Sequence, residues 1–379
     1  MKVFLEYVWL DGNGTQQLRS KTKVMEHTDL PSKYRPDDWP DWSFDGSSTN
    51  QIEQSTLKSQ NTDCILKPVY ITNDPFRGGG HKLVLCEVYN PDGITPHKSN
   101  NRHKLSEIVS DLGITENGLT KDVVAKKDLP WFGWEQEYTL MRKMVPFSSG
   151  DGIPLGFSVN NEGGVFGPRK QGDYYCGIGY DNVIGRAISE DHLNKCVEVG
   201  LDVSGVNAEV LLGQWEYQIG PVVSLNGADQ LWISRYILER VAEEHKVNVS
   251  LHPKPLKGGE WNGSGCHANF STKEMRDEGG MDHIMDAMDR LMETHKDHIN
   301  VYGLDNDQRS TGTLETSDLN KFSWGFGSRD TSIRIPIQTK IERKGYFEDR
   351  RPASNCDPYL VSEVMLQTVY KKSPMVNIV

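Results

Sequence analysis

The chain has 379 residues, 36% of them hydrophobic and 25% charged, so it can bury a full core and has a length typical of two domains. Its formal net charge is −11, because 53 acidic residues outnumber 42 basic ones, which excludes a nucleic-acid partner attracted by an overall basic surface. No run of 18 apolar residues occurs, which excludes a transmembrane helix. Six widely spaced cysteines without a C-x-x-C pair indicate reduced thiols and a cytoplasmic protein.

The first hundred residues are predicted to be rich in β-strands. The N-terminal stretch carries Glu6 inside its apolar run and lacks a small-residue cleavage site, so it indicates a first strand rather than a signal peptide. The sequence D-G-N-G at 11–14 indicates the turn after this strand. Further strands are predicted near 63–70 and 81–90.

A helix is predicted at about 99–112, where Leu105, Val109 and their neighbours recur at helical spacing. We place a domain boundary within it, between a domain of residues 1–106 and a domain of residues 107–379. Beyond it, strands alternate with helices predicted near 187–199, 228–245 and 281–299 and after Asp357. Methionines at helical spacing in 281–299 indicate core packing. The fold class is therefore α+β, an antiparallel sheet with helices packed outside it.

The stretch W-F-G-W-E-Q-E-Y at 131–138 places two carboxylates in an aromatic run. The run is typical of a strand, in which residues two apart share a face, so Glu135 and Glu137 are predicted to lie side by side. Like charges beside aromatic rings are costly unless a positive group lies between them. The simpler interpretation is a pair of solvated glutamates on an amphipathic strand.

Three further stretches combine acids or histidine with aromatic or glycine neighbours. In 206–221, Glu209 and Glu216 flank a predicted turn or bulge at Gly213. In 261–271, His267 enters a strand-like run, although a lone histidine is more often structural than a ligand. In 334–352, Glu348 precedes two arginines, a pattern that is usually a solvated face.

Five glutamates and one histidine with little sulfur suit hard ions such as Mg²⁺ or Mn²⁺. The arginines that suit phosphate or carboxylate groups are Arg309, Arg329, Arg334, Arg350 and Arg351. Divalent ions with arginines are the usual equipment of phosphoryl transfer, although no P-loop motif is present. His295 and His298 lack the H-E-x-x-H pattern and are predicted to lie on the surface.

Several stretches, taken in order along the chain, resemble the glutamine synthetase family. They are W-F-G-W-E-Q-E-Y, N-A-E-V…Q-W-E-Y-Q-I-G-P, W-N-G-S-G-C-H-A-N-F-S, S-I-R-I-P and G-Y-F-E-D-R-R-P-A-S-N-C-D-P, and with W-S-F-D-G-S-S-T they span residues 42 to 358. The sequences of these stretches resemble the type II, eukaryotic-like branch of the family. The resemblance implies an N-terminal β-grasp domain, a C-terminal catalytic domain of antiparallel sheet and helices, and two stacked pentameric rings with active sites between subunits.

The implied reaction is the ATP-dependent ligation of ammonia to the γ-carboxylate of L-glutamate through γ-glutamyl phosphate, with two or three Mg²⁺ or Mn²⁺ ions per site. By resemblance, one ion is held by Glu137, Glu209 and Glu216 and another by Glu135, His267 and Glu348. The neighbouring carboxylates of the strand at 131–138 would thus serve adjacent metal sites. The implied partners are ATP, L-glutamate, ammonium and further copies of the chain, with no nucleic acid and no membrane.

The other implied site residues follow the same motifs. By resemblance, Asp45 binds ammonium from the neighbouring subunit, and Glu315 lies on a mobile flap over the glutamate site. Glutamate meets Asn262, Gly263, Arg309 and Glu315, and Arg350 meets both glutamate and the transferred phosphate. The implied nucleotide contacts are Trp131, Glu135, Gln218, Gly220, Pro221, Asn269, Ser271, Arg329, Arg334, Tyr346 and Phe347.

The chain departs from the family pattern around the glutamate site. Gln308 and Ser310 stand where relatives usually carry arginine and leucine, and Glu260 replaces an asparagine. These departures spare the metal and phosphate positions, and they bear on substrate grip and on the acceptor amine. The alternatives are a glutamate–polyamine ligase of the same family, a non-catalytic structural relative, and a guanidino kinase, which would need a reactive cysteine.

Overall fold

The computed structural model describes residues 1–31, 35–52, 62–114, 129–143, 152–159, 165–167, 169–256, 261–313 and 316–370. The chain divides into two units, one of Met1–Val123 with Glu198–Gly200 and one of Val124–Val197 with Leu201–Val379. All six cysteines are free thiols, as predicted. None of the helices in the described ranges is long and apolar enough to cross a membrane.

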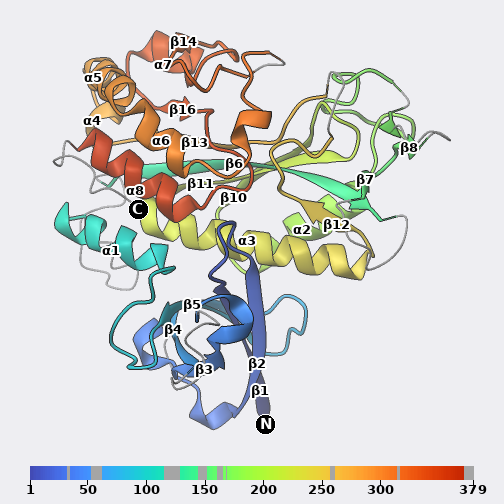
Figure 1. The fold of residues 1–379 in the computed structure, drawn as a ribbon, viewed down its shortest axis with the longest axis vertical. Coiled ribbons are helices and arrows are strands. Elements are labelled where there is room, and N and C mark those ends of the chain that lie inside the picture. Colours follow the sequence, from blue (N-terminus) through green and yellow to red (C-terminus); the bar gives the residue numbers. More distant parts are fainter. Residues whose placement is uncertain are drawn as a thin grey trace. The chain divides into compact units, whose positions relative to one another are not determined.

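The smaller unit is built on a five-stranded mixed sheet (blue in Figure 1). Its strands and helix are β1 (Lys2–Leu10), β2 (Leu18–Glu26), β3 (Trp42–Asp45), β4 (Asp63–Asn73), β5 (Lys82–Tyr89) and α1 (Asn101–Asp111). The strand order is β2-β1-β5-β4-β3, and β1 runs antiparallel to β2 and parallel to β5. Alternate residues of β1, Val3, Leu5, Tyr7 and Trp9, are buried in the core of this unit.

The larger unit carries a nine-stranded sheet. The strands of this sheet are β6 (Trp131–Arg142), β7 (Ile153–Pro154), β10 (Val203–Ala208), β11 (Gln214–Val223), β12 (Asn248–Ser250), β13 (Cys266–Ser271), β14 (Trp324–Phe326), β15 (Ile333–Ile335) and β16 (Phe347–Asp349). Strands β8 (Ser158–Val159) and β9 (Val165–Phe166) pair separately. The main strand order is β10-β11-β6-β13-β16-β15-β14, with β7 and β12 also paired to β6.

The larger unit contains seven described helices. They are α2 (Arg186–Glu198), α3 (Ser224–Glu244), α4 (Lys273–Arg276), α5 (Gly280–Glu293), α6 (His295–Val301), α7 (Ile337–Glu342) and α8 (Pro358–Val369). Helix α3 packs against one face of this sheet, on β6, β11 and β12, and α8 packs on α3 (Figure 1). The α+β class predicted from the sequence is thus confirmed, and Asp357 caps α8 as predicted by accepting the Tyr359 N–H.

Strand β6 explains how one stretch can be both aromatic and acidic. Its burial alternates residue by residue from Trp131 to Tyr138. Trp134, Gln136 and Tyr138 face the helices, and Oε1 of Gln136 accepts hydrogen bonds from Arg235 of α3 at 2.9 and 2.6 Å. The glutamates occupy the other face, so the run is a two-faced strand.

Two predictions for the region after α4 are wrong. The helix expected at 281–299 is two helices, α5 and α6, which break at Thr294, whose hydroxyl donates to the Arg290 carbonyl. His295 and His298, expected on the surface, are both buried. Residues three apart on a helix share a face, and this face of α6 packs on Arg351.

Candidate active site

The register of the larger sheet brings the predicted acids together. Residues directly opposite on neighbouring strands point to the same face. One row across the sheet is Asn207, Glu216 and Glu137, and the next is Gln218, Glu135 and His267. A third row is Asn269, Glu348 and Arg334. Six strands, β10, β11, β6, β13, β16 and β15, therefore place these side chains on the face opposite helix α3.

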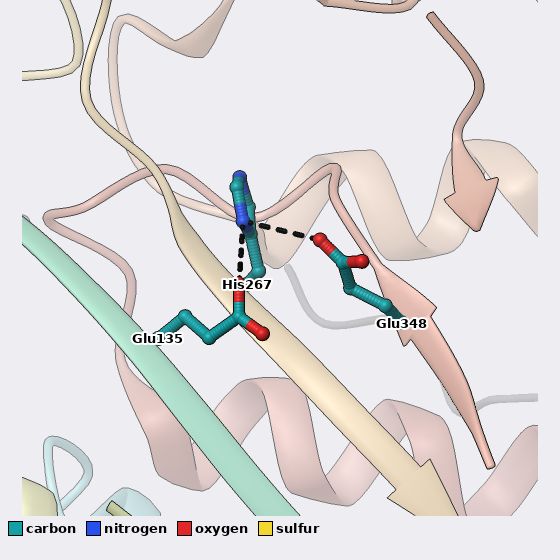
Figure 2. Close-up of side chains that lie close together, drawn as sticks. All are labelled: Glu135, His267 and Glu348. Carbon is teal, nitrogen blue, oxygen red and sulfur yellow. Dashed lines mark hydrogen bonds and ion pairs between the residues drawn. The ribbon is translucent and has the colours of Figure 1, made fainter. Parts of the chain in front are cut away.

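His267 lies between three carboxylates. Figure 2 shows its ring reaching from β13 toward Glu135 of β6 and Glu348 of β16. Nδ1 of His267 lies 3.3 Å from Oε2 of Glu135 and 3.4 Å from Oε1 of Glu348, and Nε2 lies 3.8 Å from Oε1 of Glu137. One ligand atom from each of Glu135, His267 and Glu348 lies within 4.8 Å of the others. Two carboxylate oxygens and an imidazole nitrogen at this spacing fit a divalent cation such as Mg²⁺ or Mn²⁺.

The second group of acids lies around the turn between β10 and β11. Gly213 forms this predicted turn with φ +83°, and a Cβ there would lie 2.9 Å from the Leu155 carbonyl oxygen. Nδ2 of Asn207 donates to Oε1 of Glu209 at 3.1 Å. Oε2 of Glu137 accepts from the Gly265 N–H at 2.9 Å and from Nε2 of Gln214 at 3.2 Å.

Burial, and then the neighbouring charges, shift the pKa values of these groups. Burial, and then repulsion from Glu209, raises the pKa of Glu137 to about 8. Burial, and then repulsion from Glu135, Glu137 and Glu209, raises the pKa of Glu216 to about 10. Burial, and then the Arg350 charge, lowers the pKa of His267 well below its ordinary value, so the ring is neutral. Carboxylates that resist ionisation together are typical of a site that binds a cation.

Arginines border the acids. Glu348 accepts from Nη1 of Arg334 at 2.7 Å and from Nη1 of Arg350 at 2.6 Å. Nη2 of Arg309 donates to the Arg350 carbonyl at 3.0 Å and to Nε2 of His267 at 3.1 Å. Ser310 accepts from Nη1 of Arg309 at 3.4 Å, so the serine that departs from the family pattern contacts this arginine directly.

Two adjoining cavities open on this face of the sheet. The first, of about 420 Å³, is lined by all six predicted metal ligands together with Asn262, Gly263, Arg309, Arg329, Arg334 and Arg350. The second, of about 450 Å³, is lined by aromatic and apolar groups and by the predicted nucleotide contacts Trp131, Gly220, Pro221, Asn269, Ser271 and Tyr346. Glu135 and Gln218 line both cavities.

Three predicted or candidate residues, Phe347, Arg351 and Asp45, line neither cavity. Phe347 is fully buried and packs on Phe270, with ring centroids 5.6 Å apart. Arg351 faces the core and is ion-paired with Asp349 at 2.7 Å, so its expected place among the substrate-binding arginines is wrong. Asp45 ends β3 in the smaller unit, where its side chain accepts the Ser47 N–H at 3.0 Å. Glu315, like the variant position Glu260, lies outside the described residues.

Other cavity-lining residues were not predicted. In the first cavity they are Tyr175, Asn207, Val210, Gln214 and Thr316. In the second, the Arg276 guanidinium lies 3.9 Å from the centre of the Trp131 ring. Asn207 had a signal, because it stands two residues before Glu209. Arg276 had none, because it reaches the cavity from a separate helix, α4.

An α+β fold with an acid-and-arginine cavity beside an aromatic one defines the class of protein. It is typical of metal-assisted phosphoryl transfer from a nucleotide. Comparison of the sequence with known proteins identifies the particular family. Residues 128–299 match the family model described as glutamine synthetase, catalytic domain.

Full-length relatives are equally informative. The chain is 45% identical to a glutamine synthetase of Yarrowia lipolytica, over 100% of this chain and 93% of that protein. It is 44% identical to a chloroplastic glutamine synthetase of Chlamydomonas reinhardtii, over 97% of this chain and 90% of that protein. It is also 44% identical to glutamine synthetase cytosolic isozyme 1-1 of Arabidopsis thaliana, over 98% of this chain and 95% of that protein. The chain belongs to the glutamine synthetase family, in its eukaryotic-type branch.

Proposed function

We propose that this protein catalyses the ATP-dependent ligation of ammonia to the γ-carboxylate of L-glutamate, giving L-glutamine, ADP and phosphate. The observation that carries the proposal is the junction of the two cavities at Glu135 and Gln218. The aromatic cavity suits a nucleotide base, and the cavity of acids and arginines suits phosphates and a dicarboxylic substrate.

The donor set supports two metal positions. Glu135, His267 and Glu348 would hold one ion, and Glu137, Glu209 and Glu216 would hold the other. Oxygen-rich ligands favour Mg²⁺ or Mn²⁺. When bound, such ions neutralise charge on phosphate and carboxylate oxygens.

The nucleotide would enter the aromatic cavity. Trp131, Pro221 and Tyr346 offer ring and apolar surfaces, while Gln218, Gly220, Asn269, Ser271 and the main chain at Phe347 complete the proposed pocket. Arg329 and Arg334 would direct the phosphates toward Glu135. This orientation places the γ-phosphoryl group at the junction of the two cavities.

Glutamate would lie in the other cavity. Arg309, with Asn262 and Gly263, would hold the α-carboxylate end, and Arg350 would meet the γ-carboxylate. A γ-carboxylate oxygen attacks the γ-phosphorus of ATP, an O–P bond forms, and the bond to the β-phosphate oxygen breaks to release ADP. Arg350 stabilises charge on the transferred phosphoryl group.

Ammonia then displaces phosphate from the acyl carbon. A new C–N bond forms, the C–O bond to phosphate breaks, and the nitrogen loses a proton. We assign ammonium binding to Asp45 of a neighbouring subunit, because its F-D-G-S-S stretch resembles that of the family. Hydrogen bonds from Ser47 lower the pKa of Asp45, which favours its anionic form. We assign to Glu315 the covering of the acyl phosphate against water.

These roles imply an assembly. We propose that residues 1–106 form a β-grasp domain that completes the active site of the neighbouring subunit, that residues 107–379 form the catalytic domain, and that subunits form two stacked pentameric rings. We also propose a cytoplasmic location, which the free thiols and the cytosolic Arabidopsis relative support.

The alternatives have weaker support. A guanidino kinase needs a reactive cysteine, but burial raises the pKa of the Cys266 thiol well above its usual range and the side chain is fully buried. A structural relative without activity would have lost metal ligands, and all six are present.

The test is phosphate release by the purified protein with ATP, Mg²⁺ and glutamate, with and without ammonium, and with glutamine measured directly. We expect ammonium-dependent phosphate release with one glutamine formed per phosphate. Turnover with polyamines alone would replace the proposal with the related ligase, and silence with every amine in a metal-loaded assembly would reject both.

A further inference from the structure

Two hydrogen bonds join Gln171 to Asn262, which lines the acid-and-arginine cavity. The Asn262 main-chain N–H donates to Oε1 of Gln171 at 2.6 Å. Nε2 of Gln171 donates to Oδ1 of Asn262 at 2.9 Å. Asn262 lines the cavity, whereas Gln171 is absent from its described lining. Among the described residues, Gln171 therefore meets the cavity lining at Asn262.

The two bonds leave one orientation for both amides. A main-chain N–H can only donate, so the Gln171 atom facing it is the oxygen. The other end of the Gln171 amide is then the NH₂ group, which needs an acceptor, so Asn262 turns its oxygen toward Gln171. The NH₂ group of Asn262 is left for the cavity. Among the described residues, Nδ2 of Asn262 has no protein acceptor.

Arg309 helps to determine which ligand group the Asn262 NH₂ would bind. Gly263, next to Asn262, packs so closely on Arg309 that a Cβ would lie 2.6 Å from the arginine Cγ. Asn262 and Arg309 line the same cavity, and a cationic guanidinium and an amide NH₂ group both offer donors only. They favour a carboxylate, whose oxygens only accept, over an amide, which also carries donors.

We propose that Gln171 is a positioning residue that holds the Asn262 amide with its NH₂ group toward the cavity, so that this end of the site selects a carboxylate. The inference rests on the proposed function, in which this carboxylate is the α-carboxylate of glutamate. Gln171 thereby discriminates glutamate from its α-amide.

The variant Gln171→Glu tests the orientation. A carboxylate still accepts the Asn262 N–H, but its second oxygen now attracts the Asn262 NH₂ group and turns the amide oxygen toward the substrate. We expect the KM for glutamate to rise roughly 10- to 100-fold, the loss expected for a hydrogen bond to a charged group, with the KM for ATP unchanged. The preference for glutamate over its α-amide should fall by a similar factor.

Two further variants separate orientation from charge and from packing. Gln171→Met releases the amide without inverting it, so its effect should be smaller than that of Gln171→Glu. Gln308→Glu adds a negative charge beside Arg309 without touching Asn262, and it measures the effect of charge alone. A merely structural Gln171 would lower the melting temperature and kcat in both Gln171 variants and leave the ratio of the two substrates unchanged, which would overturn the proposal.

Calorimetry of glutamate and its α-amide binding to the metal-loaded wild-type assembly tests the role of Gln171 separately from the proposed function. Binding of glutamate without glutamine formation would reject the proposed function while the ratio of affinities still tests Gln171. Equal affinities for the two ligands in the wild type would overturn the role of Gln171 even if glutamine is made. Binding of neither ligand would overturn both.

Discussion

Glu348 is the residue on which the candidate site depends most. Its side chain is 1% exposed, yet it contacts Arg334 and Arg350 and lies 3.4 Å from His267. A buried carboxylate is costly unless its charge is paired. The two arginines provide that pairing and hold one carboxylate oxygen toward His267.

We predict that Glu348→Ala abolishes phosphoryl transfer, by roughly 10²- to 10³-fold or more, because a proposed metal ligand and the anchor of two arginines are lost together. Phosphate release measures the activity, and light scattering measures the assembly, which should stay intact. Dissolution of the assembly would show that Glu348 has a structural role instead. Glu348→Gln keeps the shape and serves as the matched control.

Sequence reasoning at this scale succeeded where a residue type is rare in its surroundings. Glutamate beside tryptophan needs an explanation, and the structure gathers the five glutamates predicted as metal ligands on one cavity. It failed for Arg351, because E-D-R-R does not show which arginine faces the cavity and which faces the core after β16 ends. Only the register of β16 against β13 and β15 decides that.

At the scale of the element, β16 and the residues after it separate catalysis from stability. Glu348 and Arg350 face the cavity, whereas Asp349 and Arg351, which alternate with them along the chain, face the core. Asp349 accepts from Nε of Arg351 at 2.9 Å and from the Tyr302 hydroxyl at 2.7 Å. Nη1 of Arg351 lies 2.9 Å from Nδ1 of His295.

We predict that Arg351→Met destabilises the protein by about 3–5 kcal/mol, because it leaves the Asp349 carboxylate buried without its partner. Thermal or denaturant unfolding measures the change. Arg350→Met should instead reduce activity with a smaller effect on unfolding, because Arg334 still pairs the Glu348 carboxylate. Adding Asp349→Asn to Arg351→Met should recover part of the lost stability, because no buried carboxylate is then left unpaired. A double variant that is less stable than Arg351→Met would contradict this account.

Gly133 on β6 tests the nucleotide cavity. A Cβ at this position would lie 3.4 Å from the Asn269 Cβ, an ordinary contact, so the strand should accept alanine. The methyl group would occupy the face that lines the aromatic cavity. We predict that Gly133→Ala raises the KM for ATP severalfold, consistent with roughly 1 kcal/mol of lost fit, and leaves the KM for glutamate unchanged. A change in the KM for glutamate alone would place the nucleotide elsewhere.

Helix α2 should make the fold sensitive to acid. His192 is buried, its Nε2 lies 3.0 Å from the Ser234 carbonyl oxygen, and burial lowers its pKa from 6.5 to about 4. Between these values the unfolded chain binds a proton that the folded chain does not, so stability falls as pH falls from 6.5 toward 4, by about 1.4 kcal/mol per pH unit. We predict that melting of His192→Gln depends less on pH in this window. The exposed His283→Asn is the control, and equal pH dependence in both variants would argue against the buried neutral ring.

At the scale of the whole molecule, the proposed sharing of active sites between subunits is testable without a structure of the ring. Asp45→Asn and Glu348→Ala alter opposite sides of the proposed shared site. Each homogeneous variant should be inactive. When the two are co-expressed, a site formed by the intact side of each subunit regains activity, and with random mixing we expect roughly a quarter of the wild-type activity. No recovery in confirmed mixed assemblies would mean that each subunit carries its own complete site.

The sequence by itself determined which residues are candidates for the site. Period-two alternation in 131–138, glycine between Glu209 and Glu216, and histidine entering a strand all depend on local geometry, which is why they were readable along the chain. The same holds for the strands, the cap of α8 and the resemblance to glutamine synthetases.

Tertiary structure decided what those residues meet. Strand pairing across the sheet placed Glu135 opposite His267 and Glu348 beside Arg334, although these residues lie far apart in the sequence. Burial turned His295, His298 and Arg351 into core residues, and a two-point amide pair oriented Asn262. These outcomes depend on contacts between segments distant along the chain, and periodicity carries no information about which distant segments will pack together.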